Sequence, residues 1–239
     1  MTKGLLKYHF LVLLREPMNL IFGFCLPFFF LFLMSGGEEA SEAFGLFLLP
    51  LYMTIAIMVL CFTDSAMSHA HARQIKFLRR LKMTPIKPKD YIITGILSRI
   101  CTLTIFTIAF MAAASVLYDL DFASRNWPLF ISILLLTFAM FYFVAMFVAS
   151  LLKNAKSTQG LIYIVFFALL IIGGNMAFQF GNMPDFLQTA ALFFPSVLAI
   201  NLMSAAWTGA DIFYGHHFAA MVITTAIFAL LSLKFFKFE

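Results

Sequence analysis

Residues 128–152 read PLFISILLLTFAMFYFVAMFVASLL, a stretch without a charged side chain. A membrane-spanning helix needs about 20 consecutive apolar residues to cross about 30 Å of hydrocarbon. Asn126-Trp127-Pro128 opens the run, and proline is harmless in a first helical turn because its missing N–H has no helical partner there. Trp127 stands where aromatic side chains favour the membrane interface. The stretch therefore predicts a helix that crosses a lipid bilayer.

The same composition recurs along the chain. The 239 residues are 63% hydrophobic and 11% charged, whereas a typical soluble domain is about 45–50% apolar and about 25% charged. This argues against a soluble enzyme, a disordered protein and a nucleic-acid-binding domain. We predict a single all-α integral membrane domain over residues 1–239, whose six membrane spans lie at residues 18–35, 44–66, 91–118, 128–152, 158–175 and 214–236.

Features of the first two spans refine this prediction. The first run lacks a small-residue cleavage site, so we expect a span and not a cleaved signal peptide. Pro27 and Pro50 lie within spans and should kink them. Cys25, Cys61 and Cys101 lie in apolar runs without a CxxC or Cys/His cluster, so neither a disulfide framework nor a zinc site is indicated. We predict that all three are small core residues.

Basic residues lie almost entirely on one side of this topology. Of the 16 lysines and arginines, all except Arg125 fall in or beside the N-terminal segment, the loops after the second and fourth spans, and the C-terminal tail. Lys and Arg mark cytoplasmic loops, so both termini are predicted to be cytoplasmic. The net charge of +5 therefore reports orientation in the membrane and not a nucleic-acid partner.

Two segments beside the cytoplasmic face have amphipathic patterns. In residues 3–16, Leu6, Phe10, Leu13 and Leu14 share a helical face, which predicts an interfacial helix joined to the first span at Pro17; the alternative is a longer first span. In the loop 73–91, an apolar stripe is flanked by basic residues and ended by prolines. The stripe is Ile75, Phe77, Leu78 and Leu81, the basic residues are Lys76, Arg79, Arg80 and Lys82, and the prolines are Pro85 and Pro88.

This basic helix has two uses that composition does not distinguish. It suits contact with anionic lipid head groups, and it equally suits a groove on a soluble partner.

Residues 176–212 are too apolar for an ordinary extracellular loop and too broken for one span. Met183-Pro184-Asp185 predicts a helix start, and Pro195 should end that helix, which leaves two short helices. Irregular backbone at membrane depth must be covered by protein or line a cavity. We predict a re-entrant helical hairpin over 176–207. The alternative, one poorly formed span, gives seven crossings and places Lys234 and Lys237 outside, against the charge rule.

Catalytic motifs are not found. No GxxxxGK[ST], GxSxG or HExxH occurs, so ATP hydrolysis, nucleophilic hydrolysis and zinc-dependent hydrolysis are not expected on this chain. The pairs His69/His71 and His216/His217 are poor metal ligands, and no metal site is predicted. Asp64 and Arg99 lie near matching span ends. They either form an ion pair or both lie in the wet interface.

Three stretches, in order, resemble the type-2 membrane permeases of ABC exporters. LRRLKMTPIKPKDY (78–91) is similar to the family's basic cytoplasmic helix, its Thr-Pro turn and the Tyr that opens the next span. LREPMNLIFGFCLP (14–27) resembles the entry to the first span, and GGNMAFQFGNMPDFLQTAALFFP (173–195) resembles the outer segment. One departure concerns the acidic residues and glycine that commonly precede the basic helix. Ala72, Arg73, Gln74 and Lys76 stand there instead.

The resemblance implies a mechanism with named parts. Two permeases, identical or different, form the pathway, and two ATPase subunits that bind ATP and Mg²⁺ lie beneath them. The implied coupling helix is 75–82 (Ile75, Phe77, Leu78, Arg79, Arg80, Leu81 and Lys82), the connecting helix lies in 1–17 (Leu6, Phe10, Leu13, Arg15 and Glu16), and the outer hairpin includes Met183, Pro184, Asp185 and Pro195.

The implied location is the plasma membrane of a bacterium, as a multi-pass protein in contact with lipid. A Phe-rich pathway poor in charge suits export of an apolar or amphipathic cargo, namely a drug, lipid, antibiotic or hydrophobic peptide. The alternatives are a secondary transporter or channel and a membrane scaffold, neither of which needs an ATPase.

Overall fold

The computed structural model describes residues 25–35, 42–68, 70, 88–118, 126–151, 155–178, 194–209 and 216–235. No β-strand occurs within these ranges, so the predicted all-α class is confirmed for this part of the chain. The elements are α3 (Leu26–Ser35), α4 (Glu42–Val59), the π-helix η2 (Leu60–Ala66), α7 (Pro88–Tyr118), α8 (Trp127–Leu151), α9 (Ala155–Phe178), α11 (Pro195–Thr208) and α12 (His217–Phe235).

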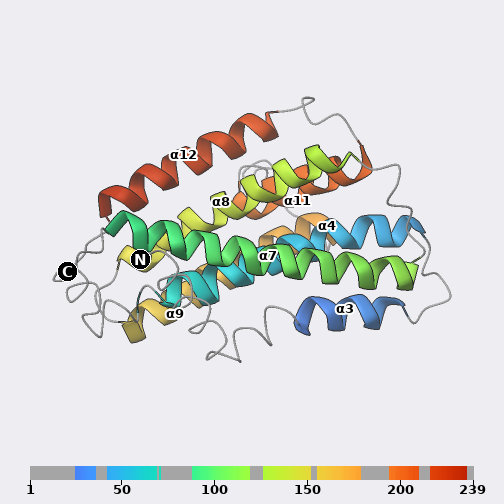
Figure 1. Cartoon of the computed structure of the whole chain (residues 1–239), viewed down its shortest axis with the longest axis horizontal. Helices are drawn as coiled ribbons and strands as arrows, with labels where there is room; N and C mark the ends of the chain where they lie inside the picture. The colour runs from blue at the N-terminus through green and yellow to red at the C-terminus, as the bar shows by residue number, and fades with distance from the viewer. Residues whose placement is uncertain are drawn as a thin grey trace.

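The long helices lie side by side along the long dimension of the molecule (Figure 1). Figure 1 shows several helix ends together at one end of the bundle. They are the end of η2, the start of α7, the end of α8, the start of α9 and the end of α12. We call this the basic end, because the adjoining segments 71–87 and 152–154 carry basic residues of the predicted cytoplasmic loops. Both segments therefore leave the bundle on the same side.

The described helices have bounds close to those of the predicted apolar runs. Four described stretches begin and end within three residues of the predicted runs. They are the continuous stretch of α4 and η2, and the helices α7, α8 and α12. α9 extends three residues beyond each end of 158–175, and α3 covers the second part of 18–35.

By length and composition, three described helices suffice to cross a membrane: Ile93–Leu117, Trp127–Leu151 and Lys156–Gly173. Leu48–Thr63 and His217–Ser232 are shorter apolar helices. The count of six crossings therefore stays a prediction.

α4 lies at the centre of the bundle, in contact with α3, α7, α8, α9 and α11. Every residue from Leu48 to Val59 is buried except Ile55, which is half-buried. A helix that is apolar on all sides suits such a position. α4 continues through Pro50, whose ring removes one helical N–H donor, and the Thr54 hydroxyl donates to the Pro50 carbonyl at 2.8 Å.

Aromatic contacts join the peripheral helices to the core. The Phe28 ring of α3 meets Phe106 and Phe110 of α7 edge-on, with centroid distances of 5.8 and 5.4 Å. On the other side, Phe147 of α8 meets Phe228 of α12 at 5.6 Å. Edge-to-face pairs at such distances are favoured by the ring quadrupole. Each outer helix is therefore held by ring geometry as well as by burial.

The prediction that all three cysteines are core residues is wrong for Cys25. Cys61 is buried and Cys101 is half-buried, but Cys25 is exposed. Its neighbours Phe29 and Phe32 are also exposed, at 61% and 71%. A lipid-facing side and a core-facing side of a membrane helix are both apolar, so an apolar run does not reveal which side a residue occupies.

Candidate functional site

Most predicted site residues lie outside the described part of the chain. These are the connecting helix within 1–17, the coupling helix 75–82, and Met183, Pro184 and Asp185 of the outer hairpin. Their roles stay predictions. Pro195 is described, and it begins helix α11, while the helix that it was predicted to end lies outside the described residues.

α11 begins at a proline and is followed by a glycine at its C-cap. Phe194 is its N-cap with extended backbone, Pro195 follows in the first turn, and the Leu198 N–H donates to the Phe194 carbonyl at 3.0 Å. At the other end Gly209 has φ 79°, a left-handed conformation that glycine adopts without steric cost, and its N–H donates to the Ala205 carbonyl at 3.0 Å. Pro195 and Gly209 therefore limit α11 to 14 residues.

α11 is packed inside the bundle although it is short. It contacts α4, α8, α9 and α12. Nine of its fourteen residues are buried, among them Met203 and Trp207. The proline and glycine at its two ends indicate a short helix. Its contacts with four other helices were not predicted from the sequence.

Three aromatic rings join the end of α11 to the start of α8. The Trp207 ring lies 5.3 Å from Phe130 and 6.3 Å from Trp127, and Trp127 lies 6.3 Å from Phe130. All three pairs are edge-on. We call these residues the aromatic cluster. Since α8 starts at the end of the bundle opposite the basic end, the cluster fixes α11 in that half (Figure 1).

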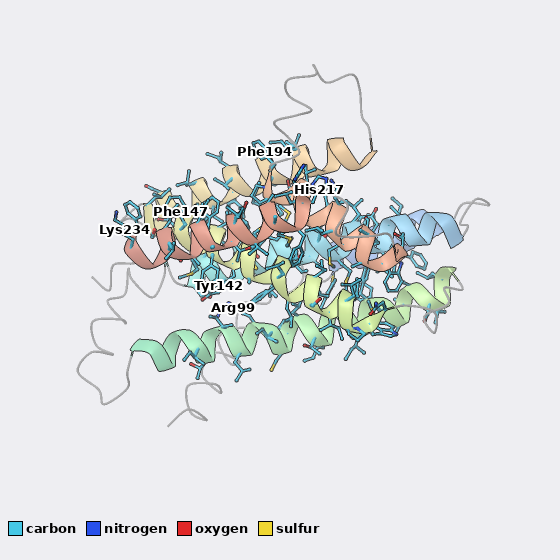
Figure 2. The ribbon with its side chains drawn as sticks, turned by 90° about the horizontal axis from the view of Figure 1, so that it is seen from above. Arg99, Tyr142, Phe147, Phe194, His217 and Lys234 are labelled. Carbon is cyan, nitrogen blue, oxygen red and sulfur yellow. The ribbon has the colours of Figure 1, made fainter. Side chains whose placement is uncertain are left out.

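A glycine contact joins the start of α11 to α9. A Cβ atom built on Gly173 would lie 3.0 Å from the Ser196 Cβ and 3.1 Å from the Ile200 Cδ1. Such distances are shorter than ordinary van der Waals contact. Gly173 therefore permits the close approach of these two helices. Phe194, labelled in Figure 2, marks the start of α11 near this contact.

Besides the packing of α11, the structure has a π-helix, η2, whose seven residues lie between α4 and the basic end. The Thr63 hydroxyl donates to the Val59 carbonyl at 2.7 Å, and the Cys61 thiol donates to the Phe138 carbonyl of α8 at 3.8 Å. π-helical turns are rare and occur frequently at functional sites. No pattern in the apolar run 44–66 distinguishes a π-helix from an α-helix, and the sequence analysis did not predict it.

A family model described as ABC-2 family transporter protein matches residues 26–234. The match begins with α3 and ends one residue before the end of α12. The chain belongs to the ABC-2 family of transporter proteins. No curated protein matches the chain significantly.

As an ABC-2 family member, the chain is the membrane permease subunit of an ABC transporter. It is a transport subunit and not itself catalytic. Family membership also implies association with ABC ATPase subunits and location in a membrane.

The polar side chains of this permease show two features within the described ranges. In the residues that the structure covers, no group of three or more His, Cys, Asp or Glu side chains is placed to hold a metal ion. Hydroxyl groups mostly donate to carbonyls of their own helix, as an apolar environment favours. Examples are Ser98 to Gly95 at 2.8 Å, Thr102 to Ser98 at 3.1 Å, Thr208 to Ser204 at 2.8 Å and Thr225 to Met221 at 2.7 Å.

Arg99 is a buried charged side chain of α7, with 4% of its surface exposed. Its Nη1 donates to the Gly95 carbonyl at 3.1 Å. Figure 2 shows Arg99 on the side of α7 that faces the other helices. The side chain of Asp64, its predicted ion-pair partner, lies outside the described part of the structure.

The outward faces of the permease helices are apolar. Large hydrophobic side chains are exposed on α7, α9 and α12, including Ile108, Val116, Ile164, Phe167 and Leu230. Exposed large apolar side chains on membrane helices are typical of contact with lipid or with another membrane subunit. This surface agrees with the membrane location.

Proposed function

We propose that this permease is the membrane-spanning subunit of an ATP-driven exporter that moves an apolar or amphipathic cargo out of the cell. The family match over nearly the whole helical bundle, residues 26–234, carries the proposal. A separate ABC ATPase hydrolyses the nucleotide, and ATP and Mg²⁺ bind to that ATPase. Two such ATPases and a second permease, identical or different, complete the transporter.

The coupling helix 75–82 is the proposed contact with the ATPase. It belongs to the segment between Ala70 and Pro88, which leaves the bundle at the basic end. The helices on its two sides, α4 with η2 and α7, contact each other, and α4 is central in the core. A displacement of this segment would therefore reach the centre of the permease. ATP drives the cycle only if it favours one conformation over the other.

Residues 176–207 are the proposed outward closure. Their described residues are the last three of α9 and residues 194–207, which include most of α11. α11 is about 21 Å long at 1.5 Å per residue, too short for about 30 Å of hydrocarbon. It lies in the half of the bundle opposite the basic end, through the contact of Trp207 with Trp127. These observations support a re-entrant element that closes the outer end of the pathway.

The apolar composition of the chain supports the proposed cargo class. The chain has 32 phenylalanines and few charges, and the hydroxyls named above already donate to helix carbonyls. Such surfaces suit drugs, lipids, lipid-like antibiotics or hydrophobic peptides better than small polar solutes.

Copurification tests the coupling claim. A tagged permease isolated in mild detergent should retain an ATPase subunit. The triple substitution Phe77→Asp, Leu78→Asp and Leu81→Asp should lower the retained ATPase about 100-fold, because it places carboxylates in an apolar groove. The matched control, Phe77→Leu with Leu78→Met and Leu81→Met, keeps the apolar stripe and should retain the ATPase.

Two results would contradict the proposal. If the aspartate variant keeps its ATPase but no longer binds anionic vesicles, the helix is a lipid contact and the coupling claim is wrong. If the permease alone, in liposomes, moves cargo along an ion gradient, transport does not depend on an ATPase.

A further inference from the structure

α11 meets α9 at a point where only a hydrogen atom fits. The atoms nearest to a Cβ on Gly173 would be the Ser196 Cβ at 3.0 Å, the Ile200 Cδ1 at 3.1 Å and the Ser196 Oγ at 3.2 Å. The Ser196 Cβ is bonded to the α11 backbone and does not move aside as a side-chain tip does. A Cβ at position 173 therefore requires the start of α11 to give way by a few tenths of an ångström.

The other end of α11 is fixed by the aromatic cluster. Trp207 is 1% exposed and packs edge-on against Phe130, which is also 1% exposed. The helix stops two residues later at Gly209. Aromatic pairs in this geometry add to the stabilisation from burial alone. Gly173 and Trp207 thus hold α11 near its two ends.

Hydrogen bonds contribute little at the start of α11. Phe194 supplies no side-chain cap bond. Within the described structure, the Ser196 Oγ is fully buried without a hydrogen-bond partner, which weakens the contact with α9. The position of α11 therefore depends on steric fit and on ring contacts.

We infer that Gly173 and Trp207 are positioning residues that keep α11 seated as the outward closure of the transport pathway. The seating itself follows from the contacts above, and the closure rests on the proposed function. Neither residue needs to touch the cargo. Each acts through the placement of α11.

Intrinsic fluorescence gives a direct readout, because both tryptophans of the chain lie in the aromatic cluster. The full-length permease in phosphatidylethanolamine–phosphatidylglycerol vesicles is quenched with acrylamide, and leakage of trapped carboxyfluorescein is followed without ATP. Gly173→Ala should displace the start of α11 and loosen its packing, raise quenching, and raise permease-dependent leakage about tenfold. Gly160→Ala is the matched control on α9, since its Cβ would meet nothing within 4 Å.

Compensation separates seating from a general loss of folding. Adding Ser196→Gly to Gly173→Ala removes the crowded Cβ and should return quenching and leakage toward the wild-type values. If Gly173→Ala does not fold, Trp207→Leu tests the other end. Trp127 should then become more quenchable and leakage should rise, while Phe167→Leu, at a position 53% exposed, should change neither.

The outcomes separate this inference from the proposed function. Equal quenching for Gly173→Ala and Gly160→Ala, or failure of Ser196→Gly to compensate, overturns the seating of α11 by Gly173. Raised quenching without raised leakage overturns the closure while the seating stands. Absence of ATPase association in the wild type removes the proposed function and leaves the quenching result unaffected.

Discussion

Arg99 is the residue whose environment most needs explanation, because a buried charge in a membrane helix is costly without compensation. Its side chain is 4% exposed on α7. The sequence places Asp64 near the matching end of the preceding span, and the backbone of Asp64 lies in η2. An ion pair and a shared wet interface make different predictions for paired substitutions.

If the two residues form a buried pair, Arg99→Gln alone should lower stability by about 3–5 kcal/mol, because it leaves the carboxylate uncompensated. Asp64→Asn with Arg99→Gln should recover most of this loss. Thermal unfolding of the purified variants in detergent measures both effects. Additive losses in the double variant would favour the wet interface instead.

At the scale of elements, the long helices were predictable and η2 was not. Uninterrupted apolar runs set the extent of α7, α8, α9 and α12, so their ends lie within three residues of the predictions. The π-helix lies within an equally apolar run, and its packing against α8 comes from tertiary structure. Likewise, Pro195 indicated a helix boundary, but the sequence did not show which helices cover α11.

η2 also sets the rotational register of the segment that follows it. A π-turn holds one more residue than an α-turn, so deleting Thr63 should let η2 adopt α-turns while the coupling segment keeps its rotation. We expect this variant to fold and to retain its ATPase, whereas deletion of Met67, in the α-helical backbone after η2, should rotate the coupling segment by about 100° and lower the retained ATPase. Thr63→Ala, which removes only the bond to the Val59 carbonyl, is the control and should retain its ATPase. Equal loss of ATPase after the two deletions would contradict a role for η2 in register.

At the scale of the whole molecule, the topology is open to a direct test on α12. In a variant without native cysteines, His216→Cys should react with a membrane-impermeant maleimide added outside cells. Lys234→Cys should react only after permeabilisation, because the basic residues predict a cytoplasmic C-terminus. Both positions are exposed in the structure. External labelling of Lys234→Cys would favour seven crossings and overturn the re-entrant hairpin.

The sequence predicted the helical class and the apolar runs because both depend on composition and period, which are local properties. The proposed site depends on two kinds of information. The coupling helix has a local amphipathic pattern, so Phe77, Leu78 and Leu81 were identifiable without a structure. Gly173 packs against Ser196, which lies on a different helix, and no local sequence pattern predicts this contact.

The subunit composition of the native transporter tests the central claim most directly. Native mass spectrometry of the complex isolated through the tagged chain should give two permease subunits, at least one of them this 27.0 kDa chain, together with two ABC ATPase subunits. Addition of Mg²⁺ and ATP should produce hydrolysis by that complex. A chain that is isolated without any ATPase, yet is folded and active in transport, would contradict the account.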